Sequence, residues 1–130
     1  MAALAKSHLI SIIDDDPSVR LATQSLVRSL GYTAEVFSSA EEYLQSGRVS
    51  GSSCVITDLH MPGMSGADLQ DRLIADGRQI PIIFMTAYFE EQTLARVMDA
   101  GAVGLLRKPF ADERLIECLD RALGINAAKQ

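Results

Sequence analysis

Five side chains in this 130-residue chain combine the chemistry of a cation site with that of phosphoryl transfer. They are Asp14, Asp15, Asp58, Thr86 and Lys108. Each stands within two residues of the end of a short apolar run. Carboxylate oxygens are preferred ligands of a hard divalent cation, and an ammonium and a hydroxyl can neutralise or bind phosphoryl oxygens.

The charge balance of this set points to a metal ion. Three neighbouring carboxylates repel one another, and Lys108 supplies one positive charge. Mg²⁺ would supply the remainder, with water and a phosphate oxygen completing its octahedron. A carboxylate in such a site can act as a nucleophile and form an aspartyl-phosphate, while cations neutralise the transferring oxygens.

Each residue also has a simpler interpretation. Asp58 alone could cap a helix beginning near Ser65, and the run 14–16 could be a solvated, helix-capping acidic segment. Thr86 could be a strand-end hydroxyl bonded to backbone, and Lys108 could be a surface lysine. The shared site is favoured because all of these groups are predicted at one edge of one sheet.

The elements that would position them are five apolar strands, each followed by a helix. The predicted strands are 8–13, 33–37, 53–57, 81–85 and 102–106, and the predicted helices are 17–30, 39–44, 67–76, 90–100 and 112–122. This alternation predicts an α/β fold, a doubly wound five-stranded parallel sheet with helices on both faces. The common strand order is 2-1-3-4-5, which brings the carboxyl ends of strands one, three, four and five together.

Local signals place the helix ends and the buried faces. Asp16 or Ser18 is predicted to cap the first helix, with Pro17 in its first turn, and Asp112 to cap the last. Helical spacing on the third and fourth helices predicts that six apolar residues face inward. These are Leu69, Leu73, Ile74, Leu94, Val97 and Met98.

The composition indicates one globular domain spanning 1–130, with a core of about 7–123 and a loose tail at 124–130. Hydrophobic content is 48% and charged content 22%. A net charge of −5 argues against a nucleic-acid-binding surface on this chain. No run approaches membrane length, and Cys54 and Cys118 lack metal or disulfide spacing. We therefore expect a cytoplasmic protein with two buried free thiols.

Taken together, these motifs make the chain similar to the response-regulator receiver domains of the CheY-like family, over residues 8–123. The segments that carry the resemblance are 13–16, 57–66, 81–87 and 100–110. The resemblance implies a flavodoxin-like (βα)₅ fold. It also implies that Asp58 is the phospho-acceptor, that Asp15 and Asp58 bind Mg²⁺ or Mn²⁺ with the backbone carbonyl of His60, and that Asp14 acts through water.

The resemblance further assigns the groups around the phosphoryl site. Thr86 would move toward the phosphoryl group, and Lys108 would pair with it, preceding a cis bond to Pro109. Leu105 stands where the family usually carries an aromatic switch residue, so that aromatic switch is not expected in its usual form. Tyr88, beside the entry to the site, would slow attack by water and so affect the lifetime of the phosphoryl group.

The function implied is a phosphorylation-dependent switch of a two-component system. A sensor histidine kinase would phosphorylate Asp58. An output domain or partner would then bind the surface formed by helix 90–100, strand 102–106 and the last helix. Homodimerisation is a further expected outcome. The sequences of residues 57–65 and 81–88 resemble, weakly, those of receivers attached to DNA-binding transcription regulators. Such a chain catalyses only its own phosphorylation and dephosphorylation.

Two alternatives have different consequences. A haloacid-dehalogenase-like phosphatase uses the same groups in another order, with its nucleophile in the first motif and its acidic pair last. Here the acidic pair comes first, and no cap insertion is present. The second alternative is a receiver-like interaction module that is never phosphorylated, which the complete Asp, Thr and Lys set argues against.

Overall fold

The computed structural model describes residues 8–124, in which five strands alternate with five helices. The strands are β1 (Leu9–Ile13), β2 (Thr33–Phe37), β3 (Cys54–Asp58), β4 (Ile82–Thr86) and β5 (Gly104–Arg107). The helices are α1 (Pro17–Ser29), α2 (Ala40–Gln45), α3 (Gly66–Ala75), α4 (Glu91–Asp99) and α5 (Asp112–Leu123). No helix in this part of the chain is long and apolar enough to cross a membrane.

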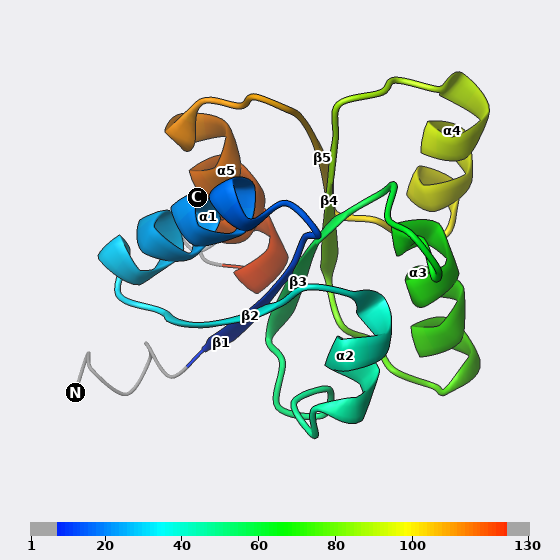
Figure 1. Cartoon of the computed structure of the whole chain (residues 1–130), viewed down its shortest axis with the longest axis horizontal. Helices are drawn as coiled ribbons and strands as arrows, with labels where there is room; N and C mark the ends of the chain where they lie inside the picture. Colours follow the sequence, from blue (N-terminus) through cyan, green and yellow to red (C-terminus); the bar gives the residue numbers. More distant parts are fainter. Residues whose placement is uncertain (1–7, 125–130) are drawn as a thin grey trace.

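All five strands are parallel and form one sheet in the order β2-β1-β3-β4-β5. Helices α1 and α5 cover one face, and α2, α3 and α4 cover the other (Figure 1). The predicted fold class and strand order are therefore confirmed. In this topology the carboxyl ends of β1, β3, β4 and β5 are adjacent along one edge of the sheet.

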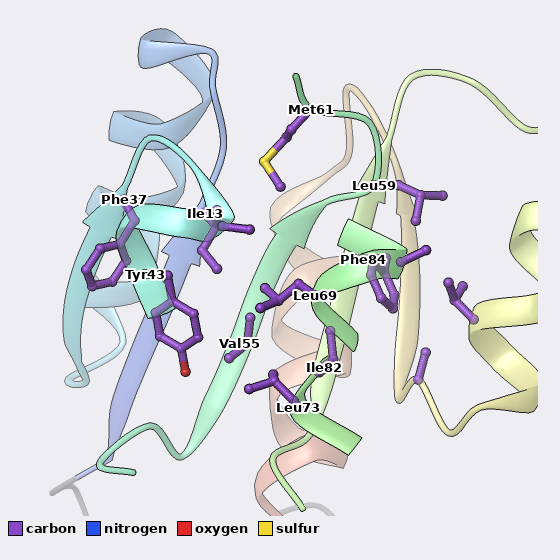
Figure 2. Close-up of a cluster of buried hydrophobic side chains, with 14 residues drawn as sticks. Ile13, Phe37, Tyr43, Val55, Leu59, Met61, Leu69, Leu73, Ile82 and Phe84 are labelled. Atoms are coloured by element: carbon purple, nitrogen blue, oxygen red, sulfur yellow. The ribbon is translucent and has the colours of Figure 1, made fainter. Parts of the chain in front are cut away.

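Two separate cores fill the space between the sheet and its helices. One lies under α2, α3 and α4 and contains Tyr43, Leu73 and Phe84, each at most 2% exposed (Figure 2). The other lies under α1 and α5 and is formed by β1, β3 and β4 side chains with residues such as Leu119 and Cys118. The central strands β3 and β4 are buried at every position, as expected for parallel strands covered on both faces.

One of the two predicted helix caps is present in the structure, and the other is not. Asp16 caps α1 by accepting a hydrogen bond from the Ser18 N–H, and Pro17 is the first helical residue. Asp112, in contrast, is not a cap. It is the first residue of α5, and Ala111 is the N-cap and has no side chain that could bond to the helix. An acidic group in the first turn still favours the helix through its interaction with the helix dipole.

Two predicted inward residues face solvent instead. Ile74 on α3 is 51% exposed and Met98 on α4 is 44% exposed, whereas Leu69, Leu73 and Val97 are buried. Both cysteines are buried and free, as predicted. Burial raises the pKa of the Cys54 thiol to about 12. The tail expected at 124–130 lies outside the described residues beyond Gly124.

Candidate functional site: an acidic cluster at the sheet edge

Asp58 is the last residue of β3, the central strand of the sheet. The prediction ended this strand one residue earlier, but the ladder continues, because Asp58 pairs with Met85 and the Leu59 N–H donates to the Met85 carbonyl at 2.8 Å. The Asp58 residue is 7% exposed. Its Oδ1 accepts a hydrogen bond from the His60 N–H at 3.2 Å, so the loop after β3 helps to orient the carboxylate.

Three carboxylates gather at this point. One oxygen each from Asp14, Asp15 and Asp58 lies within 4.8 Å of the others. Asp14 directly follows β1 and is fully buried, whereas Asp15 is exposed at the mouth of the cluster. The clustering that strand ends and topology predicted is therefore present.

Lys108 supplies a cation to this cluster. Its Nζ lies 2.9 Å from Oδ2 of Asp14 and 3.0 Å from Oδ2 of Asp58. Burial alone would lower the pKa of the Lys108 ammonium, but its attraction to the two carboxylates outweighs burial and the pKa is raised. The peptide bond from Lys108 to Pro109 is cis, the geometry that the resemblance implied.

Asp14 carries the clearest sign of an unmet demand for positive charge. Burial raises the pKa of its carboxyl group above the ordinary value, although the Asp16 N–H donates to Oδ1 at 2.9 Å and Lys108 lies beside Oδ2. That Oδ2 contact is an ion pair without hydrogen-bond geometry, so the oxygen is buried without a hydrogen bond. A hard cation among Asp14, Asp15 and Asp58 would satisfy it. The residues present therefore fit Mg²⁺ or Mn²⁺.

The Thr86 side chain is engaged by the loop that follows β4. Thr86 is the last residue of β4 and is fully buried. Its hydroxyl donates to the Tyr88 carbonyl at 2.8 Å and accepts from the Tyr88 N–H at 2.9 Å. Thr86 is therefore placed on the strand next to Asp58, and its hydroxyl bonds to the loop that leads into α4.

His60 and Tyr88 lie over the same edge of the sheet. Their rings meet edge to face with centroids 5.8 Å apart, and Tyr88 is 70% exposed. This pair joins the loop after β3 to the loop after β4. Leu105 on β5 is partly buried and packs against the core under α2, α3 and α4.

Sequence reasoning missed two residues that hold the backbone of the site. Arg20 on α1 donates from Nη1 to the Asp14 carbonyl at 2.8 Å. Glu41 on α2 accepts from the Met64 N–H at 2.9 Å, in the loop after β3. Neither contact has a local sequence signal, since both join segments that meet through the fold.

Comparisons with known proteins agree with this geometry. The family model described as the response regulator receiver domain matches residues 10–120. The response regulator protein TodT of Pseudomonas putida is 42% identical over 118 residues, which are 91% of this chain and 52% of that protein. The transcriptional regulatory protein FixJ of Bradyrhizobium diazoefficiens is 34% identical over 118 residues, 91% of this chain and 57% of that protein. The chain thus spans about half the length of these curated relatives.

Solved structures give the same result. The structure of the response regulator StyR matches with a TM-score of 0.85 and 37% identity, covering 95% of this chain and 62% of that one. The structure titled FixJ-N matches with a TM-score of 0.81 and 31% identity, covering 91% of this chain and 94% of that one. With the acidic cluster and its lysine at the expected edge of a 2-1-3-4-5 sheet, the chain belongs to the response regulator receiver domain family.

Proposed function

We propose that this receiver domain accepts a phosphoryl group on Asp58 from a sensor histidine kinase. Asp15, Asp58 and the backbone carbonyl of His60 would hold Mg²⁺ or Mn²⁺. Asp14 would act on the ion through water. The observation that carries the proposal is the convergence of three carboxylates and Lys108 at the end of β3. The match to the receiver family makes a signalling switch the function to expect of such a cluster.

The transfer would be an in-line displacement at phosphorus. A carboxylate oxygen of Asp58 forms the new O–P bond while the N–P bond to the kinase histidine breaks, and its electron pair stays on that nitrogen. The divalent ion, when bound, neutralises charge on the phosphoryl oxygens. Lys108, already beside Asp58, would move its ammonium onto one of those oxygens without leaving the site.

The phosphoryl group would also compete for the Thr86 hydroxyl. That hydroxyl now bonds to the backbone of Tyr88, so drawing it toward Asp58 breaks two hydrogen bonds in the loop before α4. The surface of α4, β5 and α5 would change as a result, and an output domain, a partner or a second copy of the chain would recognise it. The aligned residues span about half of TodT and of FixJ, and FixJ is a transcriptional regulatory protein, which supports control of transcription as the output.

This role needs no substrate besides the chain itself, because the receiver catalyses only its own phosphorylation and dephosphorylation. Tyr88 would slow the second reaction by crowding the approach of water to the aspartyl-phosphate. The buried free thiols of Cys54 and Cys118 suit the reducing cytoplasm, where we place the protein. The phosphatase and the unphosphorylated module are not favoured by the comparisons.

The test is labelling with acetyl phosphate and Mg²⁺, read as acid-labile phosphate or as a mass increase of one phosphoryl group. Asp58→Asn should abolish labelling, because an amide oxygen is a poor nucleophile and the side chain can no longer form a stable acyl phosphate. Asp99→Asn, an exposed aspartate at the end of α4, is the matched control and should label like wild type. Equal labelling of Asp58→Asn and wild type would show that another residue is the acceptor.

A further inference from the structure

Glu41 reaches from α2 to the loop that carries His60. This loop, residues 59–65, joins β3 to α3. Oε2 of Glu41 accepts a hydrogen bond from the Met64 N–H at 2.9 Å, across 23 positions of sequence. A side-chain oxygen that accepts this bond, whether of a carboxylate or of an amide, can hold a loop that has few regular backbone bonds.

The backbone beside Met64 is shaped to fit this carboxylate. Gly63 has a φ of +75°, a backbone conformation that residues other than glycine rarely adopt. A Cβ placed on Gly63 would lie 2.7 Å from the same Oε2 of Glu41, well inside contact distance. Glycine at this position therefore lets the loop approach Glu41 closely enough to form the bond to Met64.

The other attachments of the loop lie at its ends and in the core. The His60 N–H donates to Asp58, and the Gly66 N–H donates to the Leu59 carbonyl at 3.0 Å. The Met61 side chain is buried and points from the loop toward the core under α2 and α3 (Figure 2). The segment that follows Met61 is exposed up to Gly63, and the Glu41 bond holds it at Met64.

We infer that Glu41 is a positioning residue for metal binding: by holding Met64 it fixes the loop so that the His60 carbonyl faces the carboxylates of Asp15 and Asp58. The inference rests on the proposed function, in which that carbonyl is a metal ligand. Glu41 would act on the affinity for the ion and not on the transfer of the phosphoryl group, because its bond is to the loop and not to the reacting atoms.

A simpler role for Glu41 is to favour α2 through the helix dipole, since it lies in the first turn of that helix. The two roles separate chemically. Glu41→Gln removes the charge but keeps an oxygen that can accept from Met64, whereas Glu41→Ala removes both. The matched control is Glu42→Ala. The Glu42 carboxylate accepts from the Ser38 N–H at 2.6 Å and serves only the start of α2.

Three measurements on the whole chain test the inference. Hydrogen exchange of the Met64 amide, followed in the metal-free protein, reports the contact itself. Isothermal titration with Mg²⁺ reports affinity. The rate of labelling by acetyl phosphate as a function of Mg²⁺ concentration separates affinity from chemistry.

For Glu41→Ala we expect faster exchange at Met64, a Mg²⁺ dissociation constant raised about three- to tenfold, and an unchanged labelling rate at saturating Mg²⁺. Glu41→Gln and Glu42→Ala should stay near wild type in all three. Gly63→Ala tests the contact from the loop side, since its Cβ displaces the Glu41 carboxylate, and should also weaken Mg²⁺ binding.

The outcomes separate this inference from the proposed function. If wild type neither binds Mg²⁺ nor labels, the proposed function fails and the inference falls with it. If wild type binds and labels while Glu41→Ala has the same Mg²⁺ dissociation constant, the inference alone is overturned. If Glu41→Gln behaves like Glu41→Ala, charge at the helix end is responsible and the positioning role is wrong.

Discussion

The Lys108 ammonium lies 3.0 Å from Oδ2 of Asp58, although the two residues are 50 positions apart in the sequence. The ion pair connects the end of the central strand to the segment after β5. The same ammonium is shared with Asp14, so one positive charge serves two buried carboxylates. Three carboxylates meet one ammonium here, so the site has an excess of negative charge, and the first two predictions follow from that excess.

The buried carboxyl group of Asp14 should make metal-free stability depend on pH. Its pKa is raised above 3.8, so between pH 3.8 and the raised value the folded chain holds a proton that the unfolded chain has released. The free energy of unfolding must then fall as pH rises through that window. Asp14→Asn should remove this dependence and make the metal-free protein more stable at pH 7, because a neutral amide has no charge to bury there.

Urea denaturation in EDTA from pH 4 to pH 7 measures this effect. The control is Asp16→Asn, which alters the adjacent acidic sequence but keeps a residue that caps helices well. A pH profile of Asp14→Asn as steep as that of wild type would contradict the prediction.

If the acidic cluster holds Mg²⁺ as proposed, Mg²⁺ should raise the melting temperature, because the unfolded chain lacks the cluster. At a concentration a hundredfold above its dissociation constant, the expected stabilisation is about 2.7 kcal/mol. In a domain of this size that corresponds to a rise on the order of 10 °C.

Asp15→Asn should remove most of that rise, since it replaces the exposed carboxylate of the cluster with a neutral amide. Asp16→Ser keeps the cap of α1 and should respond to Mg²⁺ like wild type. Scanning calorimetry with and without Mg²⁺ gives the comparison, and an equal rise in Asp15→Asn would remove Asp15 from the ligand set.

Thr86→Ala should uncouple α4 from the acidic cluster. The substitution removes both hydrogen bonds to the Tyr88 backbone, so the Tyr88 amide should exchange faster even before phosphorylation. Labelling of Asp58 should persist, since the carboxylates and Lys108 are untouched.

The response of α4 to a beryllofluoride phosphoryl mimic should be lost in Thr86→Ala and kept in Thr86→Ser, which retains the hydroxyl. Hydrogen exchange along 87–99 is the measurement. A normal response of Thr86→Ala to the mimic would show that the threonine hydroxyl does not transmit the signal.

Gly66→Ala should damage both stability and the site. A Cβ at Gly66 would lie 2.4 Å from the Asp58 carbonyl oxygen and 3.0 Å from the Leu59 Cα, and these backbone atoms cannot move aside easily. We expect a loss of about 1 to 3 kcal/mol of unfolding free energy and weaker Mg²⁺ binding.

Gly77→Ala is the comparison for that substitution. Gly77 has a φ of +76° but open space around its Cβ position, so alanine there is strained without touching the site. It should lower stability and leave the Mg²⁺ affinity unchanged. Unfolding curves and Mg²⁺ titrations of the two variants test this prediction. An equal loss of Mg²⁺ affinity in Gly66→Ala and Gly77→Ala would contradict it.

The sequence predicted the fold and the clustering because both depend on strong local patterns. Apolar runs ending in acidic or basic residues identified the strands, and parallel topology brought their ends together. The places where prediction failed depend on neighbours. Ile74 and Met98 have helical spacing that suits burial, yet they lie at the margins of their apolar stripes, where packing decides which side chain is covered.

Side-chain contacts between distant elements were equally beyond the sequence. The bonds from the Thr86 hydroxyl to Tyr88 depend on the path of the loop after β4. The contact from Glu41 to Met64 depends on how closely α2 approaches the loop after β3. Residue types identify which groups could react, whereas these contacts are set by the distances between elements.

The sheet keeps the side chains under α1 and α5 apart from those under α2, α3 and α4. Substitutions on opposite faces, such as Leu73→Ala with Leu119→Ala, share no partners within either cluster and should have nearly additive costs. Each core can therefore be repacked largely on its own, whereas the proposed output surface depends on both cores, because α4 lies on one face of the sheet and α5 on the other.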